Sequence, residues 1–119
     1  MEYMLLINAE GDPGSGTQEE QQAMQAAFAK YSEDIGASGV LVGGDRLQPP
    51  TAATTVRVRD DQAVTTDGPF AETKEQLGGY YLIDVPNLDD AVHWAARCPS
   101  AMGGSIEVRP LGHSVPSAK

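Results

Sequence analysis

Asp67 is the residue whose type and surroundings best fit a catalytic role. It opens the run Asp67-Gly68-Pro69-Phe70, at a junction between a predicted strand and a loop. A carboxylate that lies beside an apolar side chain such as Phe70 can act as a general base. The competing interpretation is structural, because an Asp in this position can cap its own turn while Gly68 supplies a positive φ. We predict Asp67 as a catalytic base, with the turn as the alternative.

Charged side chains follow Asp67 and precede an apolar strand. They are Glu72, Lys74 and Glu75. In a binding site, Lys74 would neutralise an anionic ligand and Glu72 would order it. Runs of charge more often form a solvated loop. The cluster therefore predicts Glu72 as a catalytic residue and Lys74 as a binding residue, with a solvated loop as the alternative.

A third carboxylate, Asp45, follows the pair Gly43-Gly44 and precedes Arg46. If this part of the chain meets the loop that begins at Asp67, the two aspartates become paired carboxylates. Two carboxyl groups in close contact cannot both ionise easily, so one becomes an acid and the other a base. A surface ion pair that involves Asp45 and Arg46 is the competing interpretation.

Aromatic and basic residues on the neighbouring predicted strands complete the candidate site. Tyr80 would present its hydroxyl to a pocket if Tyr81 packs under the helices, and the opposite register is the alternative. Three charged residues, Arg57, Glu107 and Arg109, alternate with apolar residues on their strands, so they would line the interior of a barrel or form ion pairs at an edge or interface. The residues predicted to contact a substrate are Phe70, Lys74, Tyr80, Arg57 and Arg46.

The sequence predicts neither a metal site nor a cofactor. The two histidines, His93 and His113, and the single cysteine, Cys98, lack the spacing of metal ligands. No Ser-His-Asp arrangement is visible, and no Gly-x-Gly-x-x-Gly motif opens a helix. Chemistry in this chain would therefore rest on its carboxylates.

Local signals predict the elements that position these residues. Thr17 and Glu20 form a capping box at the start of one helix, Asn87 caps a second, and Pro99 ends it. Apolar runs and β-branched alternation predict the strands at residues 3–9, 40–42, 54–59, 63–66, 79–85 and 105–110. The resulting order is that of a ferredoxin-like α+β fold, β-α-β-β-α-β, with an added hairpin in the middle.

The strand pattern also predicts a partner. Both faces of the predicted strands 3–9 and 79–85 carry apolar side chains. Two helices can cover only one face of the sheet, so the other face is expected to meet a second copy in a homodimer.

Composition sets further bounds. A chain of 119 residues predicts one domain, over residues 1–112, with a tail at residues 113–119. The net charge of −9 and the scattered basic residues disfavour direct binding to nucleic acid and to anionic membranes. With one cysteine, no apolar run of membrane-spanning length and no pattern of a signal peptide, a cytoplasmic location is expected.

The chain resembles the DGPF family, a branch of the YCII-related proteins. The resemblance is strongest over residues 67–85 and extends to residues 3–7, 39–47, 53–57, 94–99 and 106–110. It implies a ferredoxin-like fold that pairs as a dimeric α/β barrel. Two departures stand out: position 45 is Asp where members often carry Glu, and residues 11–16 are rich in glycine. The family has no firmly assigned reaction, and some members are associated with sigma factors of the extracytoplasmic-function type.

Two hypotheses about function follow. In the first, the protein is a small dimeric, enzyme-like protein that binds a small organic molecule, anionic in one version, with an acidic residue as general acid or base. In the second, it is a binding or regulatory module without catalysis. Such a module would contact a protein partner through its acidic surface, and a link to a sigma factor is suggested by family context alone.

Overall fold

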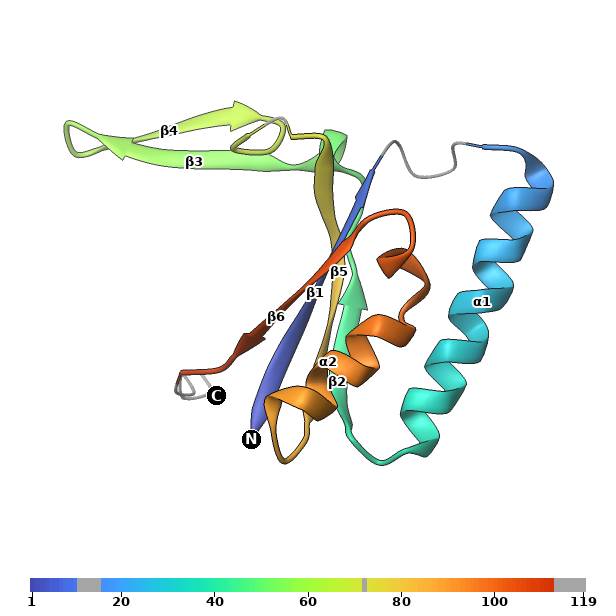
Figure 1. Cartoon of the computed structure of the whole chain (residues 1–119). Coiled ribbons are helices and arrows are strands. Elements are labelled where there is room, and N and C mark those ends of the chain that lie inside the picture. Colours follow the sequence, from blue (N-terminus) through green and yellow to red (C-terminus); the bar gives the residue numbers. More distant parts are fainter. Residues whose placement is uncertain (11–15, 72, 113–119) are drawn as a thin grey trace.

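The protein is an α+β domain, shown as a computed structural model in Figure 1. The structure describes residues 1–10, 16–71 and 73–112. The predicted tail at residues 113–119 lies outside this part of the chain. The elements in chain order are β1 (Glu2–Glu10), α1 (Gln18–Ala37), β2 (Leu41–Arg46), η1 (Pro50–Ala52), β3 (Thr54–Arg59), β4 (Gln62–Asp67), β5 (Glu75–Asp84), α2 (Leu88–Arg97), η2 (Pro99–Ala101) and β6 (Ser105–Pro110).

Four strands form one antiparallel sheet in the order β2-β5-β1-β6. With its two helices on one side, this is the ferredoxin-like arrangement that the order of predicted elements indicated. The added hairpin also forms as predicted, but it does not join the main sheet. β3 and β4 pair with each other in a separate two-stranded sheet, and Figure 1 shows it projecting from the side opposite the helices.

The helix starts are confirmed by their caps. Thr17 Oγ1 accepts a hydrogen bond from the Glu20 amide at 3.1 Å, and the Thr17 amide donates to Glu20 Oε1 at 3.5 Å. Asn87 Oδ1 accepts from the Asp90 amide at 2.9 Å, which opens α2. Each cap satisfies backbone N–H groups that the helix itself leaves unpaired.

The core lies between the sheet and the helices. Its buried residues are Tyr3, Leu5, Ile7, Tyr31, Ile35, Ile83, Val85, Ala91, Ala95 and Cys98. Tyr31 on α1 joins the two helices, because its hydroxyl donates a hydrogen bond to the Trp94 carbonyl at 2.8 Å. Its ring also makes edge contacts with Tyr81 and Trp94. Burial raises the pKa of Tyr31 and that of the Cys98 thiol, so both groups stay protonated at neutral pH.

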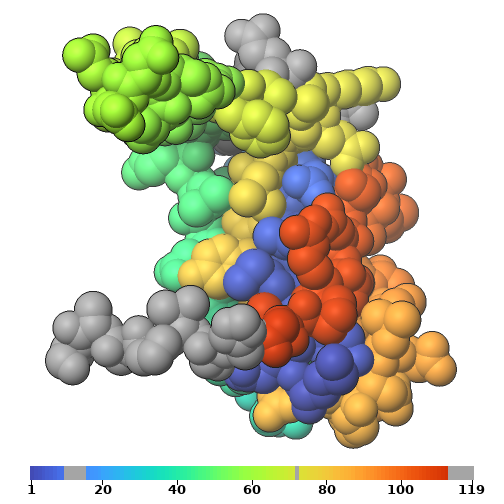
Figure 2. Space-filling model, turned by 90° about the vertical axis from the view of Figure 1, so that its left-hand side faces the viewer, coloured from blue at the N-terminus to red at the C-terminus, as the bar shows by residue number. Residues whose placement is uncertain are grey.

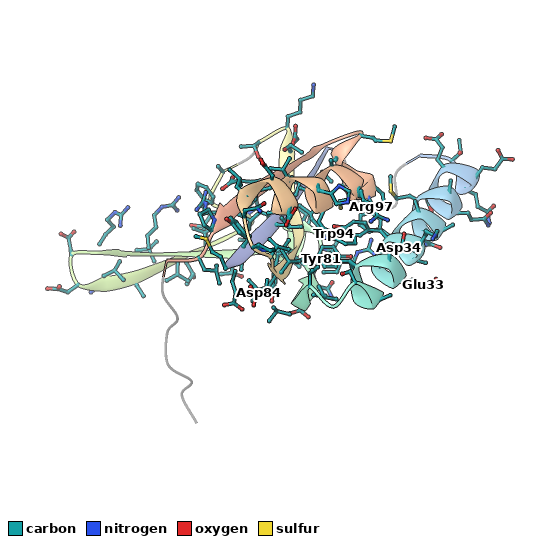
Figure 3. The ribbon with its side chains drawn as sticks, turned by 60° about the horizontal axis from the view of Figure 1, so that its bottom comes forward. Glu33, Asp34, Tyr81, Asp84, Trp94 and Arg97 are labelled. Atoms are coloured by element: carbon teal, nitrogen blue, oxygen red, sulfur yellow. The ribbon has the colours of Figure 1, made fainter. Side chains whose placement is uncertain are left out.

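A charged contact on the surface holds the helices together at the same place. Arg97 Nη2 lies 2.9 Å from Asp34 Oδ2, across the gap from α2 to α1 (Figure 3). The Arg97 guanidinium also lies over the Trp94 ring, 4.6 Å from its centroid. Partly exposed contacts of this kind each contribute about 1 kcal/mol or less.

The start of one strand differs from the sequence prediction. Strand β5 begins at Glu75 and not near Gly79, because its first residues pair with the end of β1 through a register shift after Ile7. Glu75 therefore lies in a strand and not in a loop. Met24 on α1 is 45% exposed because the first half of this helix borders an open groove.

The side of the sheet away from the helices is uncovered by any described helix. Figure 2 looks onto it and shows the four strands side by side, with the hairpin standing out above them. We call it the open face, and its side chains come from positions between the buried ones: Met4, Leu6, Asn8, Asp45, Tyr80, Leu82, Glu107 and Arg109. Met4, Leu6 and Leu82 are only partly buried there. The predicted apolar character of both faces is confirmed.

Candidate active site on the open face

A carboxylate and a phenol meet on the open face. The pairing of β2 with β5 sets Asp45 directly opposite Tyr80, and the Tyr80 hydroxyl donates a hydrogen bond to Asp45 Oδ2 at 2.8 Å. Tyr81 points the other way and packs against the helices, which settles the register of this strand. Among the described residues, only Tyr80 donates a hydrogen bond to Asp45, so the second carboxylate oxygen is open to a ligand.

Two glycines let the strands approach closely enough for this contact. A Cβ on Gly44 would lie 2.7 Å from the Tyr80 carbonyl oxygen, and a Cβ on Gly79 would lie 2.8 Å from the Asp45 carbonyl oxygen. Neither distance is compatible with a side chain, so the backbone needs glycine at both positions. The register of β2 against β5 also shifts between Leu41 and Gly43, next to this close approach.

The hydrogen bond fixes the protonation of the phenol. It raises the pKa of Tyr80, and the negative charge of Asp45 adds to this effect. The phenol therefore keeps its proton well above neutral pH. A phenol that orients a carboxylate in this way leaves the carboxylate as the acceptor, which is the arrangement of a general base with its positioning partner.

The strand pairing places two further side chains in line with Asp45 and Tyr80, so that the four form a row across the open face. Tyr80 lies opposite Leu6, and Leu6 lies opposite Glu107 on β6. The row therefore reads Asp45, Tyr80, Leu6 and Glu107, with polar groups at both sheet edges and an apolar centre. Glu107 forms an ion pair with Arg109, which is two residues along on the same face.

An open pocket of about 1,020 Å³ lies under the base of the hairpin; Leu6 and Glu107 of this row line it, whereas Asp45 and Tyr80 are outside its lining. Its lining combines apolar side chains with a few polar ones, as ligand pockets usually do. In Figure 2 the base of the hairpin and the segment after it stand over this end of the open face. The lining residues used below are Leu6, Asn8, Phe70, Leu77, Glu107 and Arg109.

The structure distributes the predicted site residues over several places. Phe70 lines the pocket and is 80% exposed, so its ring is available to a ligand or a partner. Arg57 lies within the hairpin, and Arg46 is exposed at the end of β2. Lys74 is exposed just before β5, and Glu72 lies outside the described residues. The binding roles of these residues stay predictions.

Asp67 is exposed at the end of β4, in the hairpin sheet, and does not line the pocket. Asp45 lies in the main sheet, where it bonds to Tyr80 and not to Asp67. The positive φ predicted at Gly68 is present, at +100°, and the Gly68 amide donates to the Ala53 carbonyl at 2.7 Å. The catalytic role of Asp67 and its role in capping this turn both stay predictions.

Several pocket residues escaped sequence reasoning. Asn8 and Leu77 reach the pocket through the register shift after Ile7, and Ser105 donates a hydrogen bond to Glu75 across the sheet at 2.5 Å. No local sequence pattern predicts a register shift, whereas alternation along their strand did indicate Glu107 and Arg109. Within the described ranges, no group of three His, Cys, Asp or Glu residues is placed to hold a metal ion.

Comparison with known proteins identifies the family. The sequence profile of the YCII-related domain matches residues 1–113. The chain belongs to the YCII-related family. A relative in this family, the "Uncharacterized protein R00369" of Rhizobium meliloti (strain 1021), is 39% identical over 110 residues, which cover 91% of this chain and 89% of the relative. In the described part of this YCII-related chain, no helix has the length and apolar character needed to cross a membrane.

Proposed function

We propose that this YCII-related protein is a small homodimeric enzyme-like protein that binds a small organic molecule on the open face and moves a proton with Asp45. The observation that carries the proposal is the 2.8 Å hydrogen bond from Tyr80 to Asp45, in a row of the open face whose other members, Leu6 and Glu107, line an open pocket. Tyr80 holds one oxygen of Asp45, and the other oxygen accepts a proton from the ligand. Tyr80 is thus the positioning residue and Asp45 the general base.

The reaction class that fits is proton transfer at a carbon or hydroxyl next to a carbonyl group. Such a step needs a base within hydrogen-bond reach and an environment that partly excludes water. The apolar side chains Leu6, Leu77 and Phe70 would supply that environment. Arg109, although paired with Glu107, is the basic residue in the described lining of the pocket and would attract the carboxylate of an anionic ligand.

The homodimer is supported by the apolar character of the open face. Met4, Leu6 and Leu82 are partly exposed there, although strand residues of this kind are usually covered when both sheet faces are apolar. A second copy that packs its own open face against them would bury both sets, with the sheets about 10 Å apart. This is the dimeric α/β barrel that the DGPF resemblance implies, and it would turn the open pocket into an enclosed one.

A screen of small keto acids and hydroxy acids, followed by ¹H–¹⁵N spectra of the protein, tests the site. Ligands that bind are expected to shift the amide signals of Leu6, Asn8 and Tyr80. Asp45→Asn should then abolish turnover of any ligand that reacts, with a loss of about 10²–10⁴-fold in kcat. Asp61→Asn is the matched control, because it removes the same charge at the exposed hairpin turn.

The outcome can contradict the proposal in two ways. Shifts confined to the groove between α1 and η2 would place binding elsewhere. Equal turnover in Asp45→Asn and in Asp61→Asn would show that Asp45 is not the base.

A further inference from the structure

Within the part of the chain that the structure describes, the hairpin formed by β3 and β4, residues 54–67, has no extensive contact with another helix or strand. Its two strands pair only with each other, and neither packs along a helix or along the main sheet. Figure 1 shows it projecting from the side of the sheet that faces away from the helices. An isolated two-stranded hairpin is marginally stable in water. We therefore expect that contact with another protein surface stabilises this hairpin.

One face of the hairpin is suited to such contact. Val56 is paired with Thr65 and Val58 with Ala63, which places these four side chains on the same face. Val56 is 60% exposed and Val58 is 62% exposed. The opposite face carries Arg57 and Arg59. The hairpin thus has an uncovered β-branched face, called the valine face below, and a charged face.

The area of the open face can be compared with the area that a stable dimer interface needs, because the hairpin would supply any missing contact. Four strands at about 4.8 Å spacing and about six residues of common length give a patch of about 14 by 20 Å, or about 300 Å². Stable interfaces bury about 800 Å² on each partner. The open face is therefore too small to hold two copies together without further contacts. The hairpin extends from the same side of the molecule, so it is the element placed to supply them.

The reach of the hairpin agrees with this role. Each of its strands has six residues, which span about 20 Å at about 3.4 Å per residue. Two sheets packed face to face lie about 10 Å apart. The tip of each hairpin would therefore pass the plane of the second sheet and lie along the flank of the second copy.

We propose that the hairpin is an intermolecular clasp. Each copy lays its valine face against the flank of the other, and the pair of clasps encloses the two pockets that one copy leaves open. The clasp rests on the open-face dimer of the proposed function, and it makes the site incomplete in a single copy. The partner is a second copy of this chain.

Sedimentation equilibrium on matched variants tests the clasp. Val56→Thr with Val58→Thr keeps the shape and the β-propensity of the valine face but places two hydroxyl groups in the contact. We expect the dimer dissociation constant to rise at least tenfold. Val64→Thr is the control, because Val64 lies on the charged face and is 48% exposed. It should change the constant by less than threefold.

The outcomes separate the clasp from the open-face dimer. If the wild type dimerises and the valine-face variant dimerises equally well, the clasp is wrong and the open-face dimer stands. If the wild type is a monomer at all accessible concentrations, both are wrong.

A distance-dependent measurement gives an independent test that does not depend on weakening the dimer. A spin label at Gln62→Cys would sit near the hairpin tip, and labelling is selective because Cys98 is 2% exposed. In a mixture of spin-labelled protein and ¹⁵N-labelled protein without the label, we expect broadening at the edge strands β2 and β6 of the ¹⁵N-labelled copy. Absence of intermolecular broadening in a sample shown to be dimeric would overturn the clasp.

Discussion

Replacing Gly79 by alanine is expected to damage the site through the backbone alone. The new Cβ would lie 2.8 Å from the Asp45 carbonyl oxygen, whereas ordinary contacts begin near 3.4 Å. Strand β2 must therefore move away by about 0.6 Å, the difference between these two distances. Overpacking of this size costs about 1–3 kcal/mol. The shift would also stretch the hydrogen bond between Asp45 and Tyr80.

Gly78→Ala is the matched control. It makes the same chemical change one residue earlier, but its Cβ would meet nothing nearer than the Ile7 carbonyl oxygen at 3.9 Å. Both substitutions stiffen the unfolded chain equally, which favours folding by about 0.4–1 kcal/mol. The difference between the two variants therefore isolates the steric term. We expect Gly79→Ala to be less stable than Gly78→Ala by about 1–3 kcal/mol.

Denaturation in urea at one fixed protomer concentration measures this difference, because the stability of a dimer depends on concentration. The tyrosine ring signals of ¹³C-labelled protein report whether Tyr80 keeps its hydrogen bond. Free energies of unfolding within about 0.5 kcal/mol of each other, together with an unchanged Tyr80 signal, would refute the close approach of β2 and β5.

Three further predictions concern single side chains. Tyr31→Phe should lower the free energy of unfolding by about 0.5–1.5 kcal/mol, because the partly buried Trp94 carbonyl loses its donor; urea denaturation measures it, and an unchanged midpoint would count against this bond. Asp45→Asn should lower the raised pKa of Tyr80 toward about 10, as followed by the Tyr80 ring signal. In the wild type, the stabilisation from this hydrogen bond should be present below about pH 10 and lost as the pH rises through the raised pKa, and a Tyr80 signal that titrates equally in both proteins would be inconsistent with it. Arg97→Ala should lower the free energy of unfolding, again measured in urea, by about 1 kcal/mol or less. A much larger loss would indicate a role beyond surface packing on Trp94.

Much of the fold could be predicted because its signals are local. The caps at Thr17 and Asn87 depend on residues three positions apart, and each forms as predicted. The alternation of Tyr80 and Tyr81 with their neighbours revealed two apolar faces, and the strand order supported the ferredoxin-like arrangement. Such features follow from backbone geometry and the period of the side chains.

The candidate site was harder to predict because it depends on register between distant strands. Asp45 and Tyr80 are 35 residues apart, and only the pairing of β2 with β5 brings them into contact. The sequence identified both residues but offered Asp67 and Arg46 as the partners of Asp45, and Asp67 lies in the separate hairpin sheet. That the hairpin stands apart from the main sheet was also hidden, since a β-branched strand reads the same in either sheet.

The mass of the protein in solution tests most directly whether the open face is the interface between two copies. Sedimentation equilibrium of the wild type should give twice the 12.6 kDa mass of one chain. Leu82→Asp, in the middle of the open face, should give the mass of one chain, whereas Leu88→Asp, at an exposed site on α2, should remain dimeric. A wild-type mass of one chain, or a Leu82→Asp variant that dimerises as well as Leu88→Asp, would contradict the claim.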